Sequence, residues 1–190
     1  CQRVQEKFSR LEALAPEPGR KYVFAHFLLP HPPYVITASG QCRSREEALR
    51  ASRRDNYIGQ LAYANRAALK LIDAILAARR PAVILLHSDE GPWPEPYIGD
   101  ETALGRDPVL VDWTALPPDK LREKMEILLA MRFADGRKRP LPSSPVNLYP
   151  LILKTYFGGK GRLLPDRNFV FKANRRLYEF HDVTRRLRKR

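Results

Sequence analysis

Two adjacent carboxylates followed by a glycine are the residues of this sequence best suited to chemistry. Asp89, Glu90 and Gly91 end an apolar run, AVILLHSDEG, over residues 82–91. Carboxylate oxygens are the ligands that hard divalent cations prefer, and two neighbouring carboxylates can also work as an acid and a base. The pair therefore predicts a metal site or a catalytic site, with a solvated acidic turn as the alternative.

Two histidines form a second candidate group. His26 lies inside the apolar stretch of residues 21–29, and His31 stands between Pro30 and Pro32-Pro33. Proline fixes its own φ and restricts the residue before it, so the imidazole of His31 is expected on a stiff loop just past a strand. Because imidazole changes charge near neutral pH, we expect His31 to contact an anion or a metal, with His26 as a helper. A packing or loop role for either histidine is the alternative.

The elements that would position these groups are two strands and a helix. Residues 21–29 and 82–87 are short runs of aliphatic and aromatic residues, typical of buried strands. Apolar residues at helical spacing predict a long helix between them, over residues 58–76. A strand, a helix and a second strand form a right-handed unit with parallel strands, whose carboxyl ends share one edge of the sheet. His31 and Asp89 are therefore expected to face one cleft.

The rest of the chain predicts further helices and short strands. A helix over residues 4–14 ends at a Pro-Glu-Pro-Gly turn, and Ser44 with Glu47 has the spacing of a capping box. Residues 92–112 form a long connection of the kind that serves as a lid or binding segment. Helices are expected from residues 118 and 145, and strands over residues 129–133, 169–171 and 178–180. The predicted fold class is α/β, with a mixed, largely parallel sheet sandwiched by helices.

Composition narrows the classes of partner. The 190 residues carry a formal net charge of +13, which suits a polyanion or an anionic membrane surface. The basic residues are scattered over helix ends and loops, without a basic and aromatic run of the kind that stacks on single strands, so no specific nucleic acid is expected. No apolar run approaches the ~20 residues that span a bilayer.

The two cysteines and the first residue give little more. Cys1 and Cys42 form no CxxC motif, so they indicate neither a structural zinc site nor a disulfide scaffold, and the redox compartment stays open. Because the sequence begins with Cys1, we expect further chain upstream.

Several motifs in a fixed order resemble the C-terminal part of a sulfatase-like hydrolase/transferase domain of the alkaline phosphatase superfamily. The branch that they resemble is bacterial and membrane-anchored, akin to lipoteichoic acid synthases and phosphoethanolamine transferases. The resemblance covers about residues 21–183. The motifs are YVFAHFLLPHPPY at 22–34, a helix with Tyr57, Gln60, Leu61, Tyr63 and Asn65, HSDEGP at 87–92, SPVN at 144–147, YFG at 156–158 and LLPDR at 163–167.

The resemblance implies roles for the acidic pair and for one histidine. Asp89 matches a metal-ligating aspartate, and His31 matches a histidine that touches the transferred phosphate or sulfate. Glu90 stands where the family usually has histidine, which would shift the preferred metal from zinc toward manganese, magnesium or calcium. No segment of this chain matches the nucleophile-bearing part of the family, so the chain alone is not expected to turn over substrate.

Together these features predict the C-terminal part of a metal-dependent sulfatase-like hydrolase or phospho-/sulfo-transferase. It would act on phosphate or sulfate esters, lipid-linked ones included, in an extracytoplasmic domain at a bacterial cell membrane. The alternative is a non-catalytic binding or scaffold domain that keeps the fold, and Glu90 favours it. The expected divisions are a leading helix and linker at 1–20, the sulfatase-like domain at 21–184 and a basic tail at 185–190.

Overall fold

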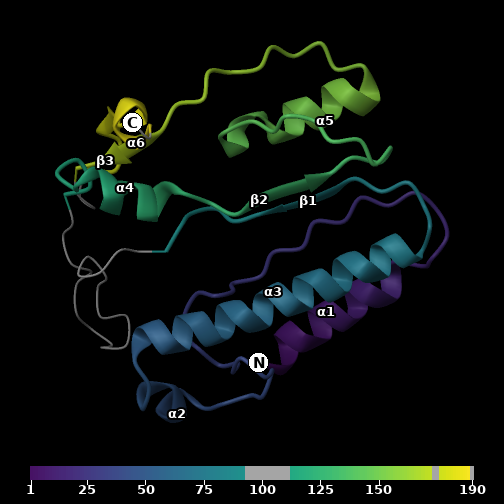
Figure 1. Ribbon diagram of the computed structural model, residues 1–190, viewed down its shortest axis with the longest axis horizontal. Helices are drawn as coiled ribbons and strands as arrows, with labels where there is room; N and C mark the ends of the chain where they lie inside the picture. Colours follow the sequence, from purple (N-terminus) through teal and green to yellow (C-terminus); the bar gives the residue numbers. More distant parts are fainter. Residues whose placement is uncertain (93–111, 173–175, 189–190) are drawn as a thin grey trace. The chain divides into compact units, whose positions relative to one another are not determined.

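A computed structural model describes residues 1–92, 112–172 and 176–188 (Figure 1). The chain divides into two compact units, Cys1–Ile84 and Leu85–Arg190. Within the described ranges, no helix combines the length and the apolar character needed to cross a membrane.

The first unit contains three helices, α1 (Gln2–Leu14), α2 (Arg45–Leu49) and α3 (Arg53–Ala77). Two of them begin earlier than predicted, α1 by two residues and α3 by five, while α2 follows the predicted cap at Ser44. The predicted capping box is confirmed: the Ser44 hydroxyl accepts from the backbone N–H of Glu47, and the Glu47 carboxylate accepts from the backbone N–H of Ser44. Ser52 caps α3 in a similar way by accepting from the backbone N–H of Asp55.

Aromatic stacking and a disulfide hold the first unit together. Helix α1 lies alongside α3 (Figure 1). The Phe8 ring of α1 is buried, with its centroid 4.1 Å from that of Phe27 and 6.4 Å from that of Tyr63 in α3. A disulfide joins Cys1 to Cys42, which lie 41 residues apart in the sequence.

Buried amides of α3 fix the loop that carries His31. Gln60 is fully buried; its side-chain oxygen accepts from the backbone N–H of Ile36, and its Nε2 donates to the carbonyl of His31 at 2.9 Å. Asn56 is also buried and donates to the carbonyl of Ala48 at 2.7 Å. These hydrogen bonds from buried side chains fix the course of the chain around α3.

The described residues of the second unit form two small sheets and four short helical segments. Strand β1 (Ile84–His87), whose first residue closes the first unit, pairs with β2 (Leu129–Arg132), and β3 (Phe169–Phe171) pairs with β4 (Phe180–Asp182). Both pairings are antiparallel. The helical segments are α4 (Pro118–Met125), the 3₁₀ helix η1 (Pro145–Asn147), α5 (Leu148–Phe157) and α6 (Thr184–Leu187).

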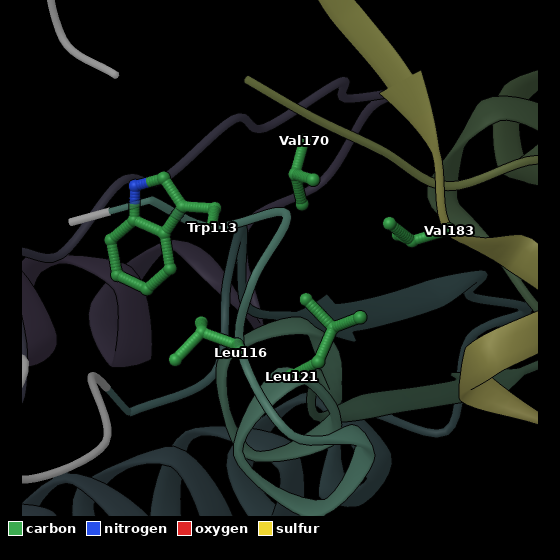
Figure 2. Packing of buried hydrophobic residues seen from close by; sticks show 5 residues of the cluster. All are labelled: Trp113, Leu116, Leu121, Val170 and Val183. Atoms are coloured by element: carbon green, nitrogen blue, oxygen red, sulfur yellow. The ribbon is translucent and has the colours of Figure 1, made fainter. Parts of the chain in front are cut away.

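The apolar core of the second unit gathers residues from distant parts of the sequence. Figure 2 shows its five buried members, which come from the segment before α4, from α4, from β3 and from the residue after β4. Arg186 of α6 donates to the carbonyl of Thr114 at 2.6 Å and also to the carbonyl of Leu116. The core residues are Trp113, Leu116, Leu121, Val170 and Val183.

The predicted fold class is wrong. Within the described parts of the chain there are only two two-stranded sheets, both antiparallel, and no largely parallel sheet sandwiched by helices. Residues 21–29 are extended but form no strand, and the side chains of Tyr22 and Phe24 are 78% and 72% exposed. β1 has β2 as its partner, and its residues are half-buried or exposed. Of the two runs expected as parallel neighbours, residues 82–87 contain β1 and residues 21–29 contain no strand, because an apolar run signals burial without specifying a pairing partner. The strands predicted over residues 129–133 and 169–171 are confirmed as β2 and β3.

Other sequence predictions have mixed outcomes. The helix stop at Gly158 is confirmed, since this residue has a φ of 66° in the left-handed region. The last strand begins at Phe180, two residues later than predicted. The proposed lid falls mainly on residues 93–111, outside the described residues, and the divisions at residues 20 and 184 stay a prediction.

Candidate functional site

The acidic turn after β1 is clamped to the opposing chain on both sides. The backbone N–H of Ser88 donates to the carbonyl of Leu128 at 3.0 Å, and the backbone N–H of Leu128 donates back to the Ser88 hydroxyl at 3.0 Å. On the other side of the pair, the backbone N–H of Gly91 donates to the carbonyl of Lys124 at 2.8 Å. Asp89 and Glu90 therefore sit on a turn whose two ends are fixed.

Gly91 is required by a close approach to the C-terminal end of α4. A Cβ at this position would lie 2.2 Å from the carbonyl oxygen of Glu123 and 2.6 Å from that of Glu126. These are backbone atoms, which cannot rotate away as the end of a side chain can. No residue other than glycine fits this turn against α4.

The two carboxylates of the turn have different surroundings. Asp89 is exposed, and its Oδ1 accepts from the backbone N–H of Glu90 at 3.0 Å. The carboxylate of Glu90 lies 2.8 Å from the Nζ of Lys124, whose side chain is only 11% exposed. The same ammonium lies 4.4 Å from the centre of the Trp113 ring. Glu90 is thus neutralised by a nearly buried cation, whereas Asp89 faces solvent.

The donor set for a metal is partial. Among the residues that the structure describes, no three His, Cys, Asp or Glu side chains are grouped so that they could hold an ion. Hard cations take about six oxygen ligands, and the turn offers two carboxylates, one of them paired with an ammonium. The acidic turn fits a divalent metal only if further ligands come from other parts of the protein.

His31 and His26 both lie in the first unit and are exposed. The Nδ1 of His31 lies 2.6 Å from the carbonyl oxygen of Pro32. Because a carbonyl can only accept, Nδ1 carries the proton in this contact, and Nε2 is the acceptor of the neutral ring. Asp89 belongs to the second unit, so its convergence with His31 on one cleft stays a prediction.

Asp166 is the centre of a polar cluster that sequence reasoning did not single out. Its carboxylate accepts from the backbone N–H and the hydroxyl of Ser143, from the hydroxyl of Ser144 at 2.6 Å and from the Nδ2 of Asn147 at 3.2 Å. These donors lower the pKa of Asp166, with the Ser143 hydroxyl contributing most. Asn147 also exchanges two hydrogen bonds with the backbone of Leu164.

The Asp166 cluster has a structural explanation. With four donors already around it, the carboxylate has little capacity left for a ligand, and the cluster ties residues 163–166 to the start of α5. SPVN and LLPDR drew attention to the two segments, but nothing in either motif indicated that they pair. Asp89, in contrast, is exposed and lies between two backbone hydrogen bonds, those of Ser88 and Gly91.

No protein-family model, curated protein or solved structure matches the chain. The resemblance to sulfatase-like enzymes therefore rests on the order of the sequence motifs.

Proposed function

We propose that the chain is the C-terminal part of a metal-dependent sulfatase-like hydrolase or transferase of phosphate or sulfate esters. The observation that carries this proposal is the clamped turn, which presents the Asp89 carboxylate to solvent while Ser88 and Gly91 fix the backbone on either side. A ligand group that is already ordered loses less conformational entropy when it binds an ion. The proposal concerns the activity and does not include the parallel sheet.

In this proposal the acidic turn binds the metal and the histidines contact the substrate. Asp89 is the first metal ligand of this chain, and Glu90 becomes a second ligand when Lys124 releases it. His31 neutralises charge on the phosphate or sulfate oxygens, with His26 as a helper. An all-oxygen site favours manganese, magnesium or calcium over zinc. The nucleophile and the remaining ligands would come from the rest of the parent protein.

Two further observations support an extracytoplasmic enzyme at a bacterial membrane. The disulfide between Cys1 and Cys42 is of the kind that forms and persists outside the cytoplasm. The exposed apolar side chains of Tyr22, Phe24 and Leu28 form a stretch that soluble monomers rarely leave uncovered, which supports a larger parent assembly.

Calorimetric titration of the chain with manganese and with magnesium tests the proposal. Weak binding is expected, because only part of the ligand set is present, and Asp89→Asn should abolish it. Asp119→Asn is the matched control, since Asp119 is also exposed and lies in the first turn of α4, away from Gly91. Binding that persists in Asp89→Asn would place the metal elsewhere.

A second variant separates the enzyme from the non-catalytic alternative. The ion pair between Glu90 and Lys124 favours a scaffold role, because a glutamate that is already neutralised needs no metal. If Glu90 is a ligand, Lys124→Met removes the competing ammonium and should tighten metal binding. If neither the native chain nor Lys124→Met binds manganese or magnesium, the scaffold domain becomes the better explanation.

A further inference from the structure

We propose that the outer face of the hairpin formed by β3 and β4 docks onto an anionic lipid bilayer. The inference takes the membrane location from the proposed function and adds the surface that makes the contact. It depends on the chemistry of this hairpin and not on the metal site.

Strand alternation separates the two faces of the hairpin. Val170 is 4% exposed and points into the core (Figure 2). Its neighbour Phe169 lies on the opposite face. The register places Phe180 across from Phe171, which is half-buried and packs against the core. Phe169 and Phe180 are 42% and 64% exposed. Two exposed phenylalanines, Phe169 and Phe180, thus lie on the outer side of a two-stranded ribbon.

The exposed rings form one cluster. The ring centres of Phe169 and Phe180 are 6.5 Å apart, at an interplanar angle of 73°. Tyr178, just before β4, is 90% exposed. Aromatic side chains with an apolar body are enriched where a protein meets the interface between membrane and water. Phe169 and Phe180 lie on the strands of a regular sheet, which holds their rings in fixed positions.

The charge around the cluster complements an anionic surface. The described residues within 167–188 include six basic and two acidic side chains, a net charge of +4. Both acids have basic partners, since Asp182 lies 2.7 Å from Arg167 and Glu179 lies 3.3 Å from Arg176. Lys172, Arg185 and Arg188 are exposed. Basic side chains beside exposed aromatic rings are typical of binding to anionic lipid.

Single-stranded nucleic acid suits this surface less well. Binding of successive bases uses aromatic faces as stacking platforms. Here the Phe169 and Phe180 rings meet nearly edge to face, and the guanidinium of Arg167 lies 4.8 Å from the centre of the Phe169 ring. The rings can still enter the headgroup region of a bilayer, because that contact needs no parallel stacking.

The test is cosedimentation of the full chain with vesicles at physiological salt. Vesicles of phosphatidylcholine with phosphatidylglycerol should bind the chain, and vesicles of phosphatidylcholine alone should bind it weakly. The double substitution Phe169→Ser with Phe180→Ser should weaken binding about tenfold or more. Phe157→Ser is the matched control, because Phe157 is 76% exposed on α5, outside the hairpin, and its loss should leave binding unchanged.

A second measurement avoids reliance on one variant. In Phe180→Trp, brominated lipids should quench the added tryptophan fluorescence, while in Phe157→Trp they should not. Equal loss of binding in the two serine variants, equal quenching in the two tryptophan variants, or tight binding to single-stranded DNA in place of vesicles would overturn the proposal. Vesicle binding without metal binding at Asp89 would contradict the proposed enzyme and leave the docking surface standing.

Discussion

At Gly91 the smallest possible side chain already has no room. The backbone oxygens of Glu123 and Glu126 occupy the space of a Cβ, so Gly91→Ala must push the acidic turn away from α4. We expect a loss of about 2 kcal/mol or more in the free energy of unfolding, as for overpacked interiors. Urea titration monitored by circular dichroism measures this loss.

The control for Gly91 lies in the same unit. Nothing is within 4 Å of a Cβ built on Gly161, and its φ is outside the left-handed region, so Gly161→Ala should change the stability little. Metal titration of Gly91→Ala adds a functional measure, because the displaced turn should bind manganese more weakly than the native turn. Equal stability of the two alanine variants would refute the close approach.

At the scale of elements, the Asp166 cluster joins the segment before β3 to the start of α5. Its depressed pKa means that the ionised carboxylate stabilises the folded state above the ordinary pKa of aspartate, and that this contribution is lost as the pH falls through the lowered value. Asp166→Asn should therefore cost about 1 to 2 kcal/mol at pH 7, because its amide faces the Ser143 donors.

The pH dependence of Asp166→Asn distinguishes this cause from a packing defect. The stability difference from the native chain should narrow below about pH 4, where the carboxylate takes up a proton in the unfolded chain before it does so in the folded chain. Thermal unfolding at pH 7 and at pH 3 measures the difference. Ser143→Ala should cost less, since Ser144 and Asn147 still donate to the carboxylate. A constant difference across this pH range would show that charge is not involved.

Helix ends could be read from the sequence because their signals are local. Ser44 and Glu47 are three residues apart, Pro118 opens α4 and Gly158 closes α5, so each signal lies within one turn of the end that it specifies. Strand pairing is non-local. Residues 21–29 and β1 had similar apolar patterns, yet one has no strand partner among the described residues and the other pairs with β2, about 45 residues further along.

At the candidate site, too, local features could be predicted from the sequence and contacts between distant segments could not. The sequence predicted that Asp89 and Glu90 follow a strand, and β1 confirms it. It could not predict that Lys124, 34 residues beyond Glu90, pairs with that carboxylate. Nor could it predict that Gly91 is constrained by contact with a helix that lies elsewhere in the sequence. What could not be predicted in each case is a contact between distant segments.

At the scale of the whole molecule, the disulfide makes the stability of the chain depend on whether its surroundings are oxidising or reducing. Cys1 and Cys42 enclose a loop of 41 residues, for which the chain-entropy model gives about 4 kcal/mol of stabilisation. Cys42→Ser should lose a comparable amount, measured by urea unfolding. Dithiothreitol should destabilise the native chain to the same extent and leave Cys42→Ser unchanged. If the reductant affects neither protein, the two cysteines are not bonded.

An exposed apolar stretch within residues 22–28 should control whether the isolated chain self-associates in solution. Tyr22, Phe24 and Leu28 are 78%, 72% and 69% exposed, although neighbouring Phe27 stacks on Phe8. An uncovered stretch of this kind promotes association, so the chain should self-associate at high concentration, which sedimentation velocity measures. Substituting Phe24 and Leu28 together with serine should reduce association and change the free energy of unfolding by less than about 0.5 kcal/mol, because neither side chain is buried.

Phe27→Ser should lower the stability of the chain without lowering its association, the opposite of the result expected for the double serine variant. The Phe27 ring lies 4.1 Å from the buried Phe8 ring, so its loss should destabilise the first unit by about 2 kcal/mol or more, and partial unfolding should not lower association. Comparing the two variants in the same buffer separates self-association through exposed side chains from association caused by partial unfolding. If the double serine variant unfolds as readily as Phe27→Ser, then Phe24 and Leu28 are covered in solution, and a partner surface already exists within the chain or between its copies.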